Sequence, residues 1–276
     1  MEEKNVSKGK YITVDEALNL VKSGDVIVTG LGAAEAKEMS RNLHKIADRV
    51  KDVTVTTCLP QEPGEYFMNP EYKDSFRMDG WFYTGVMRKA QKNGNVSLIP
   101  NHLHLTAFKR QFHKKTNIFW GVATPPDNHG YMSLSLSNIY EKRILKEADL
   151  VILEINENYP RTFGDVEVHI SDVDYLIETD YEPPMLPEAE PNEKDLVIGR
   201  LIAERINDGD CIQLGIGGIP NAVAVSLMDK KDLGVHTEMF TTGIMRLIRS
   251  GVITGKNKNF NYGKHVAGFA FGTGID

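Results

Sequence analysis

The chain has 276 residues, 41% of them hydrophobic and 25% charged, which excludes an intrinsically disordered or collagen-like protein and leaves room for two α/β domains. Its formal net charge of −6 comes without a long block of either sign, which excludes the basic patches typical of nucleic-acid-binding proteins and favours small-molecule partners. The N-terminus lacks a signal-peptide core and no run of about 18 apolar residues occurs, so we expect a cytoplasmic protein with no membrane association.

The start of the chain predicts a helix followed by a βαβ unit. Apolar residues recur at helical spacing over 13–22, behind Thr13 as a candidate N-cap with Glu16 three positions on. A β-rich run follows at 25–29, then a glycine-containing bend, a second helix, and another β-rich run at 51–57. Two strands joined through a helix are typical of a parallel pair.

The middle of the chain continues this alternation, with strands predicted at 96–100, 116–123 and 148–156. The pattern predicts two similar open α/β domains with mostly parallel sheets. A segment with four prolines and several acids then reads as a stiff linker. The predicted parts are a first domain at 1–182, the linker at 183–195, and the first part of a second domain at 196–276.

The second domain opens with a repeat of the first. Residues 23–32 align with 208–217, so that Gly24 falls on Gly209 at an offset of 185 residues. For the next strand we align Val53 with Val235, at an offset of 182 residues. This alignment places Thr56 opposite Glu238, so the fold itself does not require an acid there.

The candidate site lies where two strands of the second domain end. Ligands gather at the carboxyl ends of parallel strands, and glycines there let main-chain N–H groups approach a phosphate or an oxyanion. Glu238 stands near the centre of an apolar run and could be a nucleophile facing this pocket. The loop predicted to bind the ligand consists of Gly215, Ile216, Gly217, Gly218 and Ile219.

Glu238 also has two other interpretations. It could form an ion pair or lie at a solvated strand end. It also stands 21 residues after Gly217, near the spacing of a ribose-binding acid in nicotinamide enzymes, although the loop lacks the third glycine of that fingerprint.

Other candidate residues have competing structural explanations. Cys58 closes a Val/Thr strand and could be a nucleophile or a packing residue, and it lies too far from Cys211 to suggest a disulfide framework. Arg161 could bind a carboxylate substrate or fix its own loop through an ion pair. We expect no metal site, because no third ligand stands at recognisable spacing from the loop histidines His102, His104 and His129.

Several stretches resemble the acetyl-CoA hydrolase/transferase family, specifically its 4-hydroxybutyrate and butyrate:acetate CoA-transferase branch. In the second domain these are GIGGIPNAV and HTEMF, and in the first they include SGDVIVTGLGAAEAKEM, IPNHLHL, PPDNHGYMSLSLSN and EINENYPRTFGDVEVHISDVDYLIE. The likeness covers nearly the whole chain. It implies a CoA-transferase-like fold and CoA transfer between short-chain acyl-CoA and a free carboxylic acid.

The resemblance also implies roles for individual residues. Glu238 would attack the thioester and pass through an acyl–glutamyl anhydride to a glutamyl-CoA thioester, in ping-pong chemistry. The loop from Gly215 to Ile219 would hold coenzyme A, with an oxyanion donor at the N–H of Ile216. Coenzyme A is then a substrate, no tightly bound cofactor or metal is needed, and we expect a homo-oligomer.

Two departures from the family pattern bear on activity. Thr241-Thr242-Gly243 replaces the usual Ser-Asp-Gly after HTEMF. The family also continues beyond HVAGFAFGT into a segment that helps to bind coenzyme A, so we expect a truncated second domain. The alternative functions are an acyl-CoA hydrolase on the same fold and a non-catalytic module that binds coenzyme A.

Overall fold

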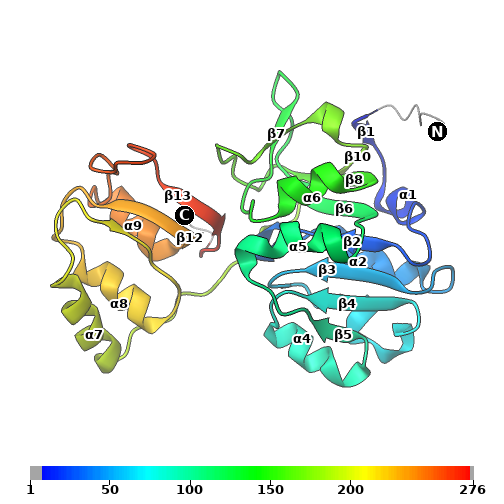
Figure 1. Ribbon diagram of the computed structural model, residues 1–276, viewed down its shortest axis with the longest axis horizontal. Helices are drawn as coiled ribbons and strands as arrows, with labels where there is room; N and C mark the ends of the chain where they lie inside the picture. The colour runs from blue at the N-terminus through cyan, green and yellow to red at the C-terminus, as the bar shows by residue number, and fades with distance from the viewer. Residues whose placement is uncertain (1–7, 274–276) are drawn as a thin grey trace. The chain divides into compact units, whose positions relative to one another are not determined.

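A computed structural model describes residues 8–273, and the chain divides into two compact units between Pro183 and Pro184 (Figure 1). Within the described part, the first unit contains one large sheet in which every paired strand is parallel to its neighbour. Its strands lie in the order β1 (Lys10–Tyr11), β10 (Tyr175–Thr179), β8 (Leu150–Asn156), β6 (Ile118–Ala123), β2 (Val26–Val28), β3 (Val53–Thr57), β4 (Phe76–Gly80) and β5 (Val96–Leu98).

Helices cover both faces of this sheet, as the strand order requires. The chain moves outward from β2 to β5 and then returns to β6, so right-handed crossovers place the early helices on one face and the later ones on the other. The first face carries α1 (Val14–Leu18), α2 (Lys37–Asn42), α3 (Glu65–Met68) and α4 (Gly85–Ala90), and the second carries α5 (Thr106–His113) and α6 (Glu141–Glu147).

Smaller elements fill the connections of the first unit. An antiparallel pair, β7 (Tyr131–Ser133) and β9 (Glu167–His169), lies outside the large sheet. The short 3-10 helices are η1 (Gly32–Ala34), η2 (Leu43–Ile46), η3 (Pro70–Tyr72), η4 (Gln91–Asn93), η5 (Leu103–Leu105) and η6 (Ile170–Asp172).

The predicted first helix is confirmed in position and capping but is shorter than expected. Thr13 and Glu16 form a reciprocal capping box at the N-terminus of α1. The helix ends at Leu18, and Ala17 and Leu18 pack into the main core of the first face. β6 is buried along its whole length, as expected for a parallel strand covered by helices on both faces.

The second unit repeats the alternation on a smaller scale. Its elements are α7 (Glu193–Ala203), β11 (Cys211–Ile212), α8 (Gly218–Ser226), β12 (Gly234–Phe240), α9 (Thr242–Arg249) and β13 (Val266–Ala270). The strands pair in parallel in the order β11-β12-β13. The predicted α/β fold with mostly parallel sheets is therefore confirmed.

The structure supports the internal repeat and corrects one alignment. The N–H of Lys22 donates to the Asp25 carboxylate, and the N–H of Asn207 donates to Asp210 in the same way, at the predicted offset of 185. For the following strand, the offset of 182 is wrong. The residue with a left-handed backbone conformation before this strand is Asp52 in one unit and Asp232 in the other, both with φ of +57°, which gives an offset of 180.

Hydrogen bonding agrees with the corrected alignment. The N–H of Thr54 donates to the carbonyl of Asp25, and the N–H of Gly234 donates to the carbonyl of Asp210. The residue of the first unit that corresponds to Glu238 is consequently Cys58 rather than Thr56. The error arose because both strands are runs of similar β-formers, within which a slip of two residues preserves the side-chain alternation.

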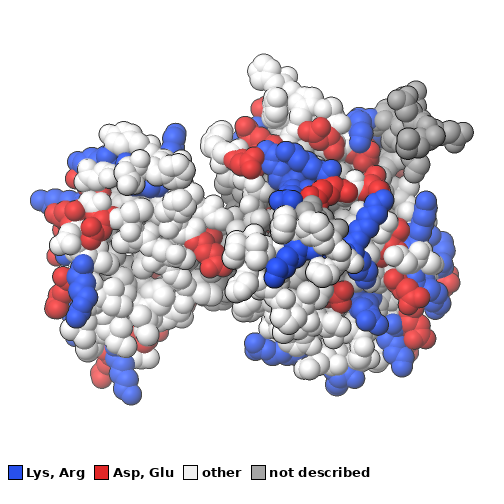
Figure 2. All heavy atoms as spheres, viewed as in Figure 1, with Lys and Arg blue, Asp and Glu red and all other residues white. Residues whose placement is uncertain are grey.

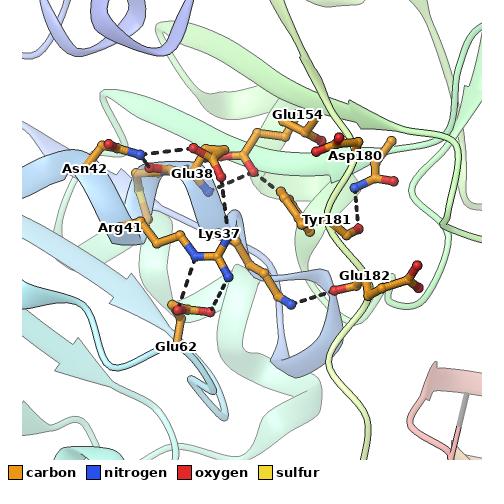
Figure 3. A network of polar contacts seen from close by, with 12 residues as sticks. Lys37, Glu38, Arg41, Asn42, Glu62, Glu154, Asp180, Tyr181 and Glu182 are labelled. Carbon is orange, nitrogen blue, oxygen red and sulfur yellow. Dashed lines mark hydrogen bonds and ion pairs between the residues drawn. The ribbon is translucent and has the colours of Figure 1, made fainter.

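A polar network holds α2 against the sheet in the first unit (Figure 3). Glu154 of β8 is fully buried and accepts hydrogen bonds from the N–H groups of Glu38 and Met39, at 3.1 and 3.0 Å. Its carboxylate also accepts from Trp120 Nε1 at 3.1 Å and from the Tyr181 hydroxyl at 2.5 Å. Since α2 has no side-chain cap of its own, Glu154 serves as its N-terminal cap from a distant strand.

The same network fixes the segment that leaves the first unit. Lys37 Nζ donates to the carbonyl of Glu182 at 2.6 Å and lies 5.2 Å from the centre of the Tyr181 ring. Asn156 donates its side-chain N–H to the carbonyl of Tyr181 at 2.8 Å. The chain is therefore anchored immediately before the boundary at Pro183.

We expect the free energy of unfolding to fall as the pH rises from about 4.5 to about 7. Burial raises the pKa of both Glu35 and Glu154 from 4.5 to about 7. Between pH 4.5 and about 7 the folded chain keeps protons on these two carboxyls, whereas the unfolded chain releases them. Protonation therefore stabilises the folded state fully below the pKa of the unfolded chain, and this stabilisation is lost as the pH rises through the pKa of the folded chain. Each group contributes up to about 3 kcal/mol.

Urea unfolding at pH 5, 6, 7 and 8 measures this slope. The variant Glu35→Gln should lose about half of it. The lowered pKa of His265 acts in the opposite direction near pH 6.5, with a smaller effect because that side chain is more exposed. Stability that rises with pH across this range in the wild-type chain would contradict the assignment.

Candidate active site

Glu238 lies on β12 with its side chain exposed. Burial alternates along this strand: Val235 and Thr237 are buried, whereas His236 and Glu238 are exposed. Since β11, β12 and β13 follow one another in a single direction, α8 and α9 cover the same face of the sheet. Glu238 points away from that covered face.

The strand register brings Glu238 beside the glycine loop. Ile212 of β11 pairs with Val235, and continuing this register by three residues places Gly215 opposite Glu238. The Thr237 hydroxyl donates to the carbonyl of Leu214 at 3.3 Å, which supports this continuation. Neighbouring strands lie about 4.8 Å apart, so the loop begins one strand spacing from the carboxylate-bearing residue.

A second glycine borders Glu238 on its other side. Thr237 pairs with Ala267 of β13 and Met239 pairs with Phe269, which places Gly268 next to Glu238. The acid is thus flanked on both neighbouring strands by residues without side chains. Reasoning from the sequence did not select Gly268, although the first glycine in HVAGFAFGT was the available signal.

The loop after β11 leaves space around its main chain. A Cβ atom added at Gly215 or Gly217 would contact nothing within 4 Å among the described residues, and Gly217 has a φ of +113° that strongly favours glycine. Gly217 is also the N-cap of α8, whose first N–H groups lack partners within the helix. The side chain of Ile216 is 53% exposed. The main chain here is open to a ligand.

The corresponding loop of the first unit contains a carboxylate. The N–H of Leu31 donates to Oε1 of the buried Glu141 at 2.9 Å. Leu31 corresponds to Ile216 at the offset of 185. Within residues 8–273, no hydrogen bond joins the N–H of Ile216 to an acceptor. In the first unit a carboxyl oxygen therefore occupies this position of the loop, whereas no acceptor among the described residues occupies it in the second unit.

Arg161, a candidate from the sequence, has a structural role. Arg161 forms ion pairs with Asp127 at 3.0 Å and Glu167 at 3.4 Å and donates to the carbonyl of Tyr131, so it fixes the loops around β7 and β9. Cys58 is buried at the end of β3.

The loop histidines do not meet at one point. His102 and His104 have ring centres 5.7 Å apart, whereas His129 accepts at its carbonyl oxygen from the ring of His169. Among the described residues, no group of three or more His, Cys, Asp or Glu side chains could hold a metal ion.

Charges of both signs are mixed on the surface of the chain (Figure 2). Figure 2 shows Lys and Arg interspersed with Asp and Glu over the face viewed. Across the described part of the chain, no helix is long and apolar enough to cross a membrane.

Comparisons with known proteins agree with these features. The family model for the acetyl-CoA hydrolase/transferase N-terminal domain matches residues 1–187. The chain is 36% identical to a probable butyrate:acetyl-CoA coenzyme A-transferase of Syntrophomonas wolfei over 96% of its length, and 32% identical to the 4-hydroxybutyrate coenzyme A transferase of Clostridium kluyveri over 99%. The crystal structure of RipA from Yersinia pestis superposes with a TM-score of 0.91 at 30% identity, covering 96% of this chain.

These proteins are longer than the present chain. The match covers 61% of the Syntrophomonas protein, 64% of the Clostridium protein and 64% of the RipA chain.

Proposed function

Because the chain belongs to the acetyl-CoA hydrolase/transferase family, we propose that it transfers coenzyme A between a short-chain acyl-CoA and a free carboxylic acid. The two named relatives are a butyrate:acetyl-CoA and a 4-hydroxybutyrate coenzyme A transferase, which supports acetyl, butyryl or 4-hydroxybutyryl groups as the acyl part. A homo-oligomer and a cytoplasmic location stay predictions from the sequence.

In this proposal Glu238 is the nucleophile. Its carboxylate oxygen attacks the thioester carbonyl and the C–S bond breaks. Coenzyme A departs as the thiolate, and an acyl–glutamyl anhydride remains on the protein. The thiolate then attacks the glutamyl carbonyl and releases the first carboxylate, which leaves coenzyme A on Glu238 as a thioester. The incoming acid repeats these steps in reverse order, so no external base, metal or oxidant is required.

The proposal rests mainly on the position of Glu238 beside the open glycine loop. When Glu238 attacks the thioester, negative charge develops on the carbonyl oxygen of the acyl group. This oxygen then lies within reach of the loop that begins at Gly215. The hydrogen bond from the N–H of Leu31 to Glu141 in the first unit supports the N–H of Ile216 as the donor to that oxygen. The flanking glycines Gly215 and Gly268 leave room for the thioester.

The exposure of Glu238 favours a second candidate, an acyl-CoA hydrolase. An anhydride keeps its reactive free energy only while water is excluded, and the side chain of Glu238 is exposed. Water that reaches the anhydride completes hydrolysis instead of transfer. Thiol release from acetyl-CoA without added butyrate indicates hydrolysis, whereas butyryl-CoA formed only when butyrate is added indicates transfer.

Covalent trapping tests the assignment of Glu238. The chain is incubated with acetyl-CoA, reduced with borohydride and digested, and we expect mass spectrometry to find the reduced residue at position 238. The same peptide from Glu238→Ala should be unmodified. Unmodified wild-type protein at saturating acetyl-CoA would contradict both candidates and would favour a module that only binds coenzyme A.

A further inference from the structure

Arg110 of α5 is buried with one edge of its guanidinium unpaired. The residue is 7% exposed, and neither Nε nor Nη2 has a hydrogen-bond partner in the part of the chain that the structure describes. The N–H of Nε and one N–H of Nη2 lie in the guanidinium plane and point outward from the same edge of the group. Together they form the fork that binds a carboxylate through two parallel hydrogen bonds.

The surroundings of Arg110 contain further unpaired polar groups. Asp79 of β4 is 9% exposed and attracts Arg110 electrostatically, yet no ion pair or hydrogen bond joins it to Arg110 among residues 8–273. Thr56 is the neighbour of Asp79 on β3, and its buried hydroxyl also lacks a partner. Lys114 at the end of α5 contacts Thr54, and Thr56 lies two residues further on β3, so the Thr56 hydroxyl faces the same side of the sheet as α5. This side therefore offers two donors from Arg110 and a third from Thr56.

Positive charge exceeds negative charge around these donors. Lys114, one turn after Arg110, donates from Nζ to the Thr54 hydroxyl at 2.9 Å. Burial lowers the pKa of Lys114, and the charges of Asp79, Arg110 and Arg77 also act on it, so one carboxylate faces three cations here. The excess of positive charge favours an anionic ligand despite the proximity of Asp79.

An unpaired buried guanidinium is costly. Burial lowers the pKa of Arg110, but arginine stays charged in proteins, so the charge cannot be relieved by loss of a proton. The two unmade hydrogen bonds and the lost hydration both oppose folding. A single water molecule presents one oxygen to the fork, whereas a planar carboxylate presents two at the required spacing.

We propose that the fork of Arg110, together with the Thr56 hydroxyl, binds the carboxylate of a small organic acid between α5 and strands β3 and β4. This site lies in the first unit, on residues separate from Glu238 and its loop. The fork is fully covered, so the acid enters when α5 moves away from the sheet. Binding therefore also fixes α5, whose outer side exposes Phe108 and Phe112.

Thermal unfolding of the full chain tests the proposal with sodium acetate and sodium butyrate against sodium chloride at equal ionic strength. We expect the carboxylates to raise the Tm by about 2 °C or more at saturation relative to chloride. In Arg110→Met, which keeps most of the side-chain volume and removes the unpaired charge, that shift should vanish while the Tm in chloride equals or exceeds the wild-type value. The exposed Arg88→Met is the matched control and should keep the shift.

Hydrogen exchange provides a second readout. Acetate should slow amide exchange in α5 at least about threefold in the wild-type chain and leave it unchanged in Arg110→Met. Three outcomes overturn the proposal: a wild-type shift no larger than in chloride, a shift that persists in Arg110→Met, or a loss of stability in Arg110→Met that reveals a direct pair with Asp79. Because Glu238→Ala should keep the shift, this test and that of the proposed function fail independently.

Discussion

Replacing Glu238 by Gln is expected to reduce coenzyme A transfer at least about a thousand-fold, because the amide cannot attack the thioester. The free energy of unfolding should change by less than about 0.5 kcal/mol, as is usual for exposed positions without special contacts. The side chain is exposed, and within the described residues no hydrogen bond or ion pair engages its carboxylate. Steady-state assay with acetyl-CoA and butyrate measures the first quantity, and urea unfolding measures the second.

Glu178 supplies a matched control for this experiment. It is an exposed glutamate near the carboxyl end of a parallel strand, β10, in the first unit. Glu178→Gln should leave both turnover and stability at the wild-type level. Equal activity in Glu238→Gln and wild type would show that Glu238 is not the nucleophile. An unfolded Glu238→Gln would show that the carboxylate has a structural partner.

Replacing Glu154 by Ala is expected to lower the free energy of unfolding by about 4 kcal/mol. The change removes the side-chain acceptor for the N–H groups of Glu38 and Met39 in the first turn of α2, and leaves Trp120 Nε1 without its hydrogen bond in the core. It also releases the Tyr181 hydroxyl from the segment that leads to the second unit. Urea unfolding followed by circular dichroism at pH 7 measures the loss.

Tyr181→Phe separates the contributions within this network. It removes one of the four donors to Glu154 and keeps the ring beneath Lys37 and Arg41, so we expect a loss of only about 1 kcal/mol. Equal losses for Tyr181→Phe and Glu154→Ala would mean that the helix cap adds nothing. A stable Glu154→Ala variant would mean that water replaces the carboxylate at the N-terminus of α2.

The internal repeat shows both the reach and the limit of sequence comparison in this chain. Alignment of Gly24 with Gly209 gave the correct offset because glycine in a left-handed turn is chemically distinctive. Alignment of Val53 with Val235 failed because alternating β-formers carry no such marker. The left-handed Asp52 and Asp232 would have given the correct answer, since each follows a lysine in the motif Lys-Asp that opens the strand.

The sequence by itself determined the α/β alternation, the repeat, and the position of Glu238 one helix after the glycine loop. These features follow from hydrophobic periodicity and turn chemistry, which act over a few residues. Only the tertiary structure decided that Glu238 is exposed, that Gly268 borders it, that Glu154 caps a helix 115 residues earlier in the chain, and that the fork of Arg110 is unpaired. Each of these depends on which distant segments pack together, and local residue patterns do not specify that choice.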